Sequence, residues 1–310
     1  MKDSNLRSKV SLSLARYLGV GVGSLQELGS SRDNIVFMAN PREKLIVRVS
    51  LNKSQRDVEE EVRLIKYLSL KKFPVAEIKC FFTINIDTEV YPVTIFSYIG
   101  HIRTGQTTIR KTKAMAIKLA ELHNLTFLFC KSSAYRQVRT LIEPTEKLIK
   151  YLKSLGGENR SLEELSKDLE WALSFYNSEI IKNRPLLVIH NDYRIQNVLF
   201  NSDETVKAII DFDWSLTFNC PEKDIAHAAM ELSMHDGEYK YNIKTFNQFI
   251  DTYRNESELN VNLSKKYIYE WSKFSAITDA AYYFLSFPEK LKPAPKSYMY
   301  DKYKYFDSLL

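Results

Sequence analysis

Cysteine is scarce in this chain. The three cysteines that are present, Cys80, Cys130 and Cys220, are odd in number and are not spaced like the ligands of a metal ion. Such a pattern is typical of reduced, buried thiols. We therefore expect neither a disulfide framework nor a zinc site.

Long hydrophobic runs are also missing, and no segment approaches the length that crosses a membrane. The first 30 residues include the charged side chains Asp3, Arg7, Lys9 and Arg16 and no apolar block of signal-peptide length. With 45% hydrophobic residues among 310, the chain can still bury a substantial core. These features predict a soluble, cytoplasmic protein without a membrane partner, folded as one large domain or two lobes.

Blocks of like charge are absent, although the net charge is +6. The first 100 residues carry 15 Lys and Arg against 11 Asp and Glu, whereas the remainder carries 29 against 27. The excess in the first third is mild and favours an anionic ligand such as a nucleotide. No nucleic-acid partner is expected, because such a partner requires a clustered basic surface.

The first hundred residues combine strand and helix patterns. Segments 34–39 and 44–50 are rich in β-branched residues and flank a turn-like sequence, so they predict a β-hairpin. Residues 54–71 place apolar side chains on one helical face, with acidic residues early and lysines late. Further strands are expected near 77–84 and 90–98. The pattern predicts a small antiparallel sheet with one helix.

After Gly100 the pattern changes to long amphipathic helices with two short strand-like runs. Helices are expected at 111–124, 161–182, 222–233, 242–254 and 264–286, and strands at 186–189 and 206–210. No internal repeat or low-complexity linker is visible, and the Pro- and Lys-rich tail at 290–306 is expected to be loosely held. We predict an α+β protein with a sheet-based lobe at 1–98 and a mostly helical lobe at 99–310.

Four polar residues follow the strand-like runs: His190, Asp192, Asn197 and Asp211. Each alone has an ordinary explanation as a turn former, a cap or a packed histidine. Together they show the spacing of a protein-kinase catalytic loop, with a His two residues before the Asp and an Asn five residues after it. Phosphoryl transfer needs a carboxylate at the acceptor hydroxyl and oxygen ligands for Mg²⁺. The constellation therefore predicts a kinase-type phosphotransferase.

The sequence from about 20 to 230 resembles the aminoglycoside phosphotransferase and choline kinase family, small-molecule relatives of the protein kinases. HNDYRIQN matches the family's H-x-D-x-x-x-x-N loop, and IIDFDW matches its second metal-binding strand. The resemblance implies a two-lobed, protein-kinase-like fold. It also implies that Asp192 is the catalytic base, while Asn197 and Asp211 are the Mg²⁺ ligands. We expect His190 to brace the loop.

Further family motifs occur on both sides of this loop. LAELH at 119–123 and Asp-Ile-Ala at 224–226 match two of them, which implies that these segments support the catalytic loop. The linker FSYIG at 96–100 resembles the hinge whose backbone binds adenine. The candidate hinge residues are Ser97, Tyr98 and Ile99.

Phosphate contacts are expected from the first lobe. The stretch LGSSRDN resembles a phosphate-covering loop, in which Gly29 is the only glycine and Ser30 and Ser31 offer hydroxyl and backbone donors. On the following strand the family has a basic residue, commonly Lys, that contacts the α- and β-phosphates; this chain has Arg48. Its expected acidic partner is Glu61, which also fits a solvated run of three glutamates. Arg binds phosphate in a bidentate manner but is bulkier than Lys, so the exchange is not conservative.

The acceptor pocket is expected in the second lobe, from residues 213–240 and 266–286. Aromatic side chains of the late helix could bind a quaternary ammonium group, as in choline, although a buried core helix also explains them. They are Tyr267, Tyr269, Trp271, Phe274, Tyr282, Tyr283 and Phe284. An acidic wall would instead suit a polycationic aminoglycoside. Its members would be Asp213, Glu222, Glu231, Asp236 and Glu238.

We therefore predict a Mg²⁺-dependent kinase, monomeric or homodimeric, that transfers the γ-phosphate of ATP or GTP to a small-molecule hydroxyl. The acceptor classes left open are aminoglycosides and other antibiotics, choline or ethanolamine, and homoserine-like compounds. A pseudokinase or regulatory nucleotide-binding protein is the alternative; Arg48 and the glycine-poor loop favour it, whereas the intact Asp192, Asn197 and Asp211 oppose it. A two-metal phosphohydrolase is disfavoured, because the acidic cluster that it needs is not visible.

Overall fold

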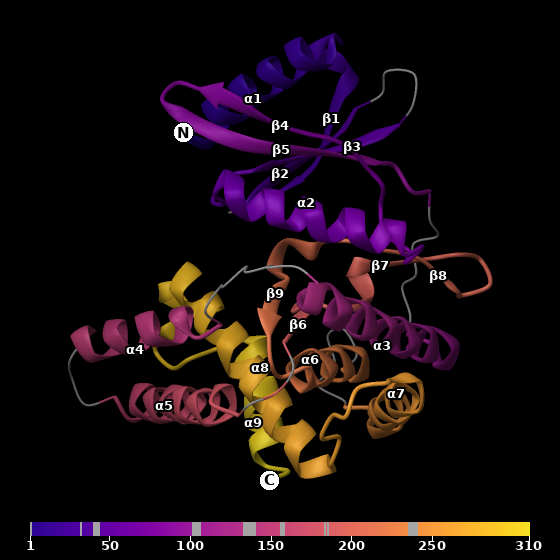
Figure 1. Ribbon diagram of the computed structural model, residues 1–310. Coiled ribbons are helices and arrows are strands. Elements are labelled where there is room, and N and C mark those ends of the chain that lie inside the picture. The colour runs from indigo at the N-terminus through magenta and orange to yellow at the C-terminus, as the bar shows by residue number, and fades with distance from the viewer. Residues whose placement is uncertain are drawn as a thin grey trace. The chain divides into compact units, whose positions relative to one another are not determined.

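The computed structural model of the protein describes residues 2–31, 33–39, 44–100, 107–132, 141–155, 159–182, 184, 186–234 and 241–310. The chain divides into two compact units, whose elements are drawn in Figure 1. The first, called the sheet unit, contains Met1–Arg103, Leu199–Ser202 and Lys207–Asp213. The second, called the helical unit, contains Thr104–Val198, Asp203–Val206 and Trp214–Leu310. The α+β class is confirmed, while the lobe boundary between residues 98 and 99 stays a prediction.

A five-stranded antiparallel sheet, in the order β1-β2-β3-β5-β4, forms the framework of the sheet unit. Its strands are β1 (Leu25–Ser30), β2 (Asn34–Ala39), β3 (Leu45–Ser50), β4 (Ile78–Ile86) and β5 (Glu89–Ser97). The hairpin predicted from the β-branched runs is β2 and β3. Because side chains alternate along a strand, Val47 and Val49 enter the apolar core, whereas Ile46 and Arg48 face a cavity on the opposite side.

Different helices cover the two faces of this sheet (Figure 1). The helix α1 (Lys2–Leu18), which the sequence analysis did not predict, places Val10 and Leu14 in the same core cluster as Val47 and Val49. These four side chains, with their neighbours, are almost fully removed from water. Burial of apolar surface on this scale is the main stabilising contribution to such a unit.

The helix α2 (Gln55–Leu70) begins close to where it was predicted. Ser54 caps it by accepting the amide N–H of Asp57, and the Asp57 side chain in turn accepts the Ser54 amide, which completes a capping box. The cap fixes the helical register, and the register places Glu61 on the buried face of α2.

The helical unit contains the remaining described helices. They are α3 (Ile109–Ser132), α4 (Glu143–Leu155), α5 (Arg160–Ile180), α6 (Glu222–Ser233), α7 (Ile243–Glu256), α8 (Lys265–Ser286) and α9 (Tyr298–Asp307). The helix α8 contacts α4, α5, α6 and α9, and it is buried on most sides, which explains its apolar composition. No described helix is both long enough and apolar enough to cross a membrane.

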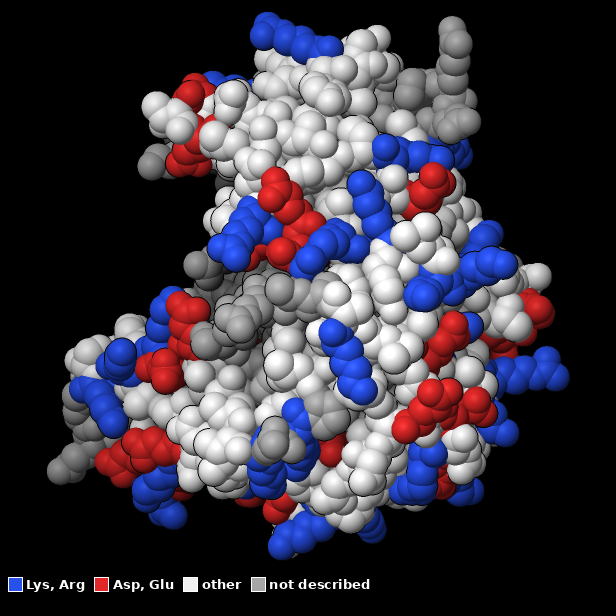
Figure 2. Space-filling model, viewed as in Figure 1, with Lys and Arg blue, Asp and Glu red and all other residues white. Residues whose placement is uncertain are grey.

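Short strands carry the motif residues. In the helical unit, β6 (Leu187–Ile189) pairs with β9 (Leu216–Phe218), and the catalytic-loop motif begins directly after β6. The strands β7 (Val198–Phe200) and β8 (Val206–Ile209) form a second pair, and Asp211 follows β8. On the face seen in Figure 2, basic and acidic side chains of the described residues are interspersed.

The expectation of a loosely held tail is wrong. Residues Tyr298–Asp307 form α9, in which Phe306 is fully buried and the hydroxyls of Tyr300 and Tyr303 both donate to Asp168 on α5, each at 2.8 Å. Although the tail is rich in Pro and Lys, its aromatic residues form a stripe along one side of α9. That stripe packs against α8 and fixes the end of the chain.

Replacement of Phe306 by Ala should therefore destabilise the protein by about 3–5 kcal/mol, because it leaves a cavity among packed rings. Urea unfolding followed by circular dichroism measures this change. The matched control is Leu310→Ala, since Leu310 is about half exposed and its loss should change stability by roughly 0.5 kcal/mol or less. Equal stability of Phe306→Ala and the wild type would show that α9 is not anchored.

Candidate active site

The catalytic-loop motif is held by one buried carboxylate. His190 and Asn191 follow directly after β6, and the carboxylate of Asp224, on α6, accepts a hydrogen bond from the backbone N–H of each. Oδ2 accepts from His190 and Oδ1 from Asn191, both at 2.8 Å. Asn191 has a φ of 68°, a left-handed conformation that Asn tolerates better than most residues. The two hydrogen bonds and this turn fix the direction in which the chain presents Asp192.

Asp224, from the predicted supporting motif at 224–226, is itself held by the other predicted supporting motif, LAELH at 119–123. His123 of the LAELH motif places Nε2 3.1 Å from Asp224 Oδ2, and its Nδ1 lies 2.8 Å from the hydroxyl of Tyr253. Burial alone would raise the pKa of Asp224, but the hydrogen bond from His123 and the nearby positive charges lower it to about 2. The structure thus brings both predicted supporting motifs to the loop.

His190 lies in the position expected of a bracing residue. Its side chain is fully buried, and its ring stands edge-on to Tyr193 with the ring centroids 5.6 Å apart. The Tyr193 hydroxyl donates to the backbone carbonyl of Met115 on α3 at 3.0 Å. The loop is therefore tied to α3 as well as to α6.

Asp192 and Asn197 are brought together in the helical unit. The Asn197 amide donates from Nδ2 to the Asp192 backbone carbonyl at 2.9 Å and to Asp192 Oδ2 at 2.8 Å. This contact directs the Asn197 amide oxygen away from Asp192, so the oxygen that a hard cation would bind is not used by this pair. Burial would raise the pKa of Asp192, but the nearby His227 and Arg194 lower it, so the carboxylate is ionised at neutral pH.

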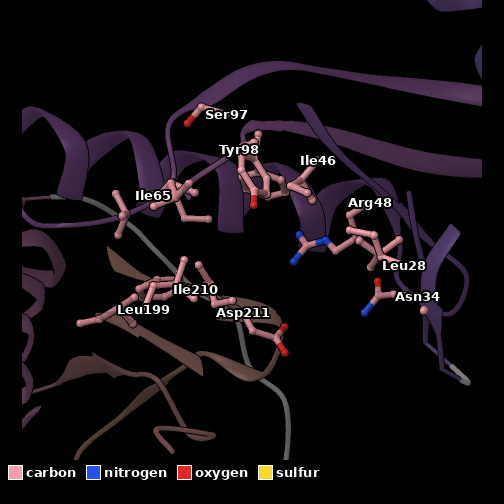
Figure 3. A pocket seen from close by; sticks show the side chains of 18 of the residues that line it. Leu28, Asn34, Ile46, Arg48, Ile65, Ser97, Tyr98, Leu199, Ile210 and Asp211 are labelled. Atoms are coloured by element: carbon pink, nitrogen blue, oxygen red, sulfur yellow. The ribbon is translucent and has the colours of Figure 1, made fainter. Parts of the chain in front are cut away.

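In the sheet unit, the predicted nucleotide residues line one cavity of about 530 Å³ (Figure 3). Its walls are mostly apolar and come from both the sheet and the β7–β8 segment; they include Leu28, Val36, Ile46, Ile65, Phe96, Leu199 and Ile210. In Figure 3, Ser97 and Tyr98 lie on the upper side of the cavity, Arg48 and Asn34 lie together on the right, and Asp211 lies on the lower side. A mostly apolar cavity that also presents a guanidinium and a carboxylate suits a base against the apolar walls and phosphates beside the charged groups.

Arg48 is part of a buried four-residue ion network. Its Nη2 lies 2.7 Å from Glu61 Oε1, so the predicted ion pair is present, and its Nη1 lies 2.5 Å from Asp213 Oδ1. Lys53 contacts the same two carboxylates, at 3.1 Å from Glu61 and 2.9 Å from Asp213. Asn34 donates to the second oxygen of Asp213. Two cations and two anions, all of them almost fully buried, therefore balance one another.

The ion network also shifts the pKa values of Asp213 and Arg48. Burial alone would raise the pKa of Asp213, but the adjacent Arg48 and Lys53 hold it well below its ordinary value. Burial alone would lower the pKa of Arg48, but Asp213 and Glu61 raise it above its ordinary value, with a further contribution from Asp211. Asp211 has a φ of 65°, a strained conformation for a non-glycine residue of the kind that concentrates at functional sites.

Several candidate residues of the hinge and of the phosphate-covering loop already make hydrogen bonds within the protein. The backbone N–H of Ser97 donates to the carbonyl of Glu77 at 2.9 Å, and that of Tyr98 donates to Lys44 at 3.2 Å. A bound base could use neither N–H group without breaking these bonds. Ser30, Ser31 and Ile99 also line the cavity. The Ser30 hydroxyl accepts a hydrogen bond from Arg7 at 2.7 Å, and the Ser31 hydroxyl accepts one from the backbone N–H of Asn34 at 3.0 Å.

Lys53 is a site residue that the sequence analysis missed. It follows Arg48 by five residues and precedes the helix cap, where a solvated lysine is the ordinary expectation. Its contacts with Glu61 and Asp213 join parts of the chain that are far apart in sequence, so no local pattern indicates them.

The predicted acidic wall is wrong for its described members. Asp213 is neutralised by Arg48 and Lys53 in the sheet unit, as described above. In the helical unit Glu222 pairs with Arg184 at 3.1 Å, and Glu231 pairs with Lys302. Asp236 and Glu238 lie outside the described residues.

Most of the aromatic residues of α8 pack in the core, as expected if α8 is a buried core helix. Tyr267, Tyr269, Trp271, Phe274 and Phe284 are buried. Tyr282 and Tyr283 are partly exposed, and Tyr282 stands edge-on to Trp214 with ring centroids 5.5 Å apart. An aromatic contribution to acceptor binding is therefore limited to this end of α8.

Comparison with known proteins places this fold among kinase-like structures. It is similar to an amicoumacin kinase in complex with AMP-PNP and Ca²⁺, with a TM-score of 0.73 and 12% identity over 98% of this chain and 94% of that one. It is also similar to a Plasmodium vivax ethanolamine kinase, with a TM-score of 0.63 and 17% identity over 93% and 84%. At these identities the similarity concerns the fold alone. A search of curated proteins finds no match to the sequence.

The sequence profile of the phosphotransferase enzyme family matches residues 24–246, which is most of the chain. The protein belongs to this family. It is therefore a small-molecule phosphotransferase with an alcohol group as acceptor, and the class predicted from the His190–Asn197 motif is confirmed. The motif residues Asp192 and Asn197 lie in the helical unit, while Arg48, Glu61 and Asp211 lie in the sheet unit. Their convergence on one bound nucleotide stays a prediction.

Replacement of Asp213 by Asn should destabilise the protein at neutral pH by about 3–5 kcal/mol, because it leaves two buried cations to share one carboxylate. The folded-state pKa of Asp213 is depressed, so its contribution is complete above the unfolded value of about 3.9 and is lost as pH falls below it. The stability difference between wild type and variant should therefore narrow from pH 7 to pH 3.

Urea unfolding across this pH range measures the difference. Asp251→Asn is the matched control, since Asp251 is exposed and pairs only with Arg254 on its own helix. A difference that stays constant from pH 7 to pH 3 would contradict the assigned ionisation of Asp213.

Proposed function

We propose that the protein is a Mg²⁺-dependent kinase that transfers the γ-phosphate of a nucleoside triphosphate, preferably ATP, to a hydroxyl of a small molecule. The observation that carries the proposal is the cavity of the sheet unit, whose lining is mostly apolar and also includes the polar side chains of Arg48, Asn34 and Asp211. Its volume and lining suit a purine and its phosphates. The family membership supplies the reaction class.

The oxygen donors at the motif positions fit Mg²⁺. The Asp211 carboxylate and the Asn197 amide oxygen are hard ligands of the kind that Mg²⁺ prefers, together with phosphate oxygens and water. When bound there, Mg²⁺ would neutralise the charge of the phosphates. Arg48 would contact the α- and β-phosphates through guanidinium N–H groups that are not engaged by Glu61 or Asp213, while Lys53 helps to neutralise these two carboxylates.

Asp192 is proposed to position the acceptor hydroxyl and to take its proton. The hydroxyl oxygen forms a bond to the γ-phosphorus, the bond from that phosphorus to the β,γ-bridging oxygen breaks, and the nucleoside diphosphate leaves. Because the pKa of Asp192 is lowered, it is a weak base at neutral pH, so most proton transfer would follow bond formation. Alignment of the reactants and electrostatic stabilisation would then supply most of the rate.

A nucleotide-binding protein without transfer activity is the second candidate. The observation that favours it is that both guanidinium Nη atoms of Arg48 already bind carboxylates. This candidate predicts nucleotide binding without release of nucleoside diphosphate at any acceptor. A screen that couples nucleoside diphosphate release to a library of amino alcohols, aminoglycosides, sugars and amino acids separates the two.

Asp192→Asn and Asp211→Asn should each lower turnover with the best acceptor by about 10³-fold or more, since they remove the carboxylate at the hydroxyl and a metal ligand, respectively. Asp211→Asn should also weaken Mg²⁺-dependent nucleotide binding, measured by calorimetry, whereas Asp192→Asn should bind nucleotide normally. Asp301→Asn, at an exposed position of α9, is the control. Near wild-type turnover in either active-site variant would overturn the role assigned to that residue.

Arg48→Lys introduces the residue that the family commonly has at this position. A single ammonium group cannot reach Glu61 and Asp213 through two separate nitrogens and also contact phosphate, so the KM for nucleotide should rise about 10-fold. Steady-state kinetics at saturating acceptor measure it. Arg63→Lys is the matched control, because Arg63 is exposed on α2 and pairs with Glu60. An unchanged or lower KM in Arg48→Lys would exclude a phosphate contact specific to arginine.

A further inference from the structure

The sheet unit contains a buried lysine that does not line its cavity. The Lys53 side chain is 1% exposed, and its Nζ lies 3.1 Å from Glu61 Oε2 and 2.9 Å from Asp213 Oδ1. Among the described residues, Arg48 and Glu61 line the cavity and Lys53 does not. A lysine is rarely buried unless it is paired. Any effect of this lysine on a ligand in the cavity must therefore pass through its carboxylate partners.

The four charged side chains form a closed ring in which each carboxylate meets both cations. Glu61 offers Oε1 to Arg48 at 2.7 Å and Oε2 to Lys53. Asp213 offers Oδ1 to both cations, at 2.5 Å from Arg48 Nη1 and 2.9 Å from Lys53 Nζ. The other oxygen of Asp213 accepts a hydrogen bond from Asn34. All of these residues belong to the sheet unit, and the ring carries two positive and two negative charges.

Arg48 keeps hydrogen-bonding capacity in spite of its two partners. A guanidinium group has five N–H groups, and one N–H at each of Nη1 and Nη2 is enough for the two carboxylate contacts. Among the described residues, Nε of Arg48 has no hydrogen-bond partner. The remaining N–H groups can therefore donate to phosphate oxygens while both ion pairs stay in place.

The charge balance of the ring decides how strongly Arg48 attracts phosphate. Without Lys53, Arg48 would neutralise only one of two carboxylates, and the ring would carry one excess negative charge. Asp211 also acts on the charge of Arg48, so the excess would add to an existing negative field. Like charges repel strongly at short range in a medium of low dielectric constant. An excess carboxylate beside Arg48 would therefore oppose the phosphates of a nucleotide.

We propose that Lys53 is a positioning residue for the nucleotide, because its pairing with Glu61 and Asp213 leaves Arg48 able to bind phosphate. The inference rests on the nucleotide binding of the proposed function. It explains how a guanidinium group whose two Nη atoms both contact carboxylates can still serve a phosphate ligand. Since Lys53 acts on phosphate binding and not on the base, its effect should depend on the phosphates of the ligand.

The experiment compares ATP·Mg²⁺ with adenosine, which has the base and no phosphate. Calorimetry with the full-length protein measures the Kd of each ligand. In Lys53→Met, the Kd of ATP·Mg²⁺ should rise about 10-fold or more, whereas the Kd of adenosine should change less than about 2-fold. The KM for ATP should rise in parallel, while kcat at saturating ATP should stay within about 3-fold of the wild type.

A second substitution separates the charge balance from the loss of the lysine side chain. In Lys53→Met/Asp213→Asn, one cation again faces one carboxylate, so the Kd of ATP·Mg²⁺ should return to within about 3-fold of the wild type. If Lys53→Met alone does not fold, Asp213→Asn and the double variant are compared instead. The double variant should then bind ATP·Mg²⁺ about 10-fold more weakly than Asp213→Asn and adenosine equally well.

Lys66→Met is the matched control, since Lys66 is exposed on α2, and it should leave both Kd values unchanged. Thermal unfolding of each variant without ligand reports its stability. A lower unfolding temperature of Lys53→Met with an unchanged ratio of the two Kd values would assign Lys53 a structural role alone and overturn the inference. Equal weakening of ATP and adenosine binding would overturn it as well, because the effect would then concern the whole cavity.

The same measurements distinguish the inference from the function beneath it. Wild-type protein that binds ATP·Mg²⁺ and transfers phosphate to no acceptor would contradict the proposed function, whereas the two Kd values would still decide the role of Lys53. Unchanged ATP affinity in Lys53→Met, together with normal transfer, would overturn the inference and leave the kinase assignment intact. Wild-type protein that binds no nucleotide would contradict both.

Discussion

The Asp224 carboxylate is the constraint on which the catalytic loop depends. It is buried, accepts two successive backbone N–H groups of the loop and contacts His123, so it connects α6, α3 and the residues after β6 through one side chain. Such a group is costly to bury unless it is hydrogen-bonded, and here the two backbone N–H groups and His123 contact its two oxygens. The position of Asp192, the proposed catalytic base, follows from this single anchor.

In the sheet unit, buried charged side chains are compensated by oppositely charged neighbours. Arg48 and Lys53 share Glu61 and Asp213, so Arg48, which lines the cavity, is held without an unpaired buried charge. Asp213 is only two residues after Asp211, and its ion pairs therefore restrain the chain that presents the second proposed metal ligand. A buried network of this kind contributes more to geometry than to net stability, because desolvation offsets much of the Coulombic gain.

Local features could be read from the sequence, whereas contacts between distant segments could not. The β2–β3 hairpin, the capped α2 and the His190–Asn197 spacing each depend on neighbouring residues, and the Arg48–Glu61 pair followed from the family resemblance. Lys53 and His227 escaped notice because their partners lie far away in sequence and their own surroundings look ordinary. The helix α9 was missed because its aromatic residues lie among lysines in a Pro- and Lys-rich segment. Asp213 was grouped with an acidic wall because its partners Arg48 and Lys53 lie far away in sequence.

The central claim is that this phosphotransferase moves a γ-phosphate from a nucleotide to a small-molecule alcohol. The most direct test is ³¹P NMR of the protein with ATP, Mg²⁺ and a mixture of amino alcohols. The account predicts that the γ-phosphate resonance is replaced by a phosphomonoester resonance in step with the appearance of ADP. Bound but unconsumed ATP, or inorganic phosphate as the sole product, would contradict it.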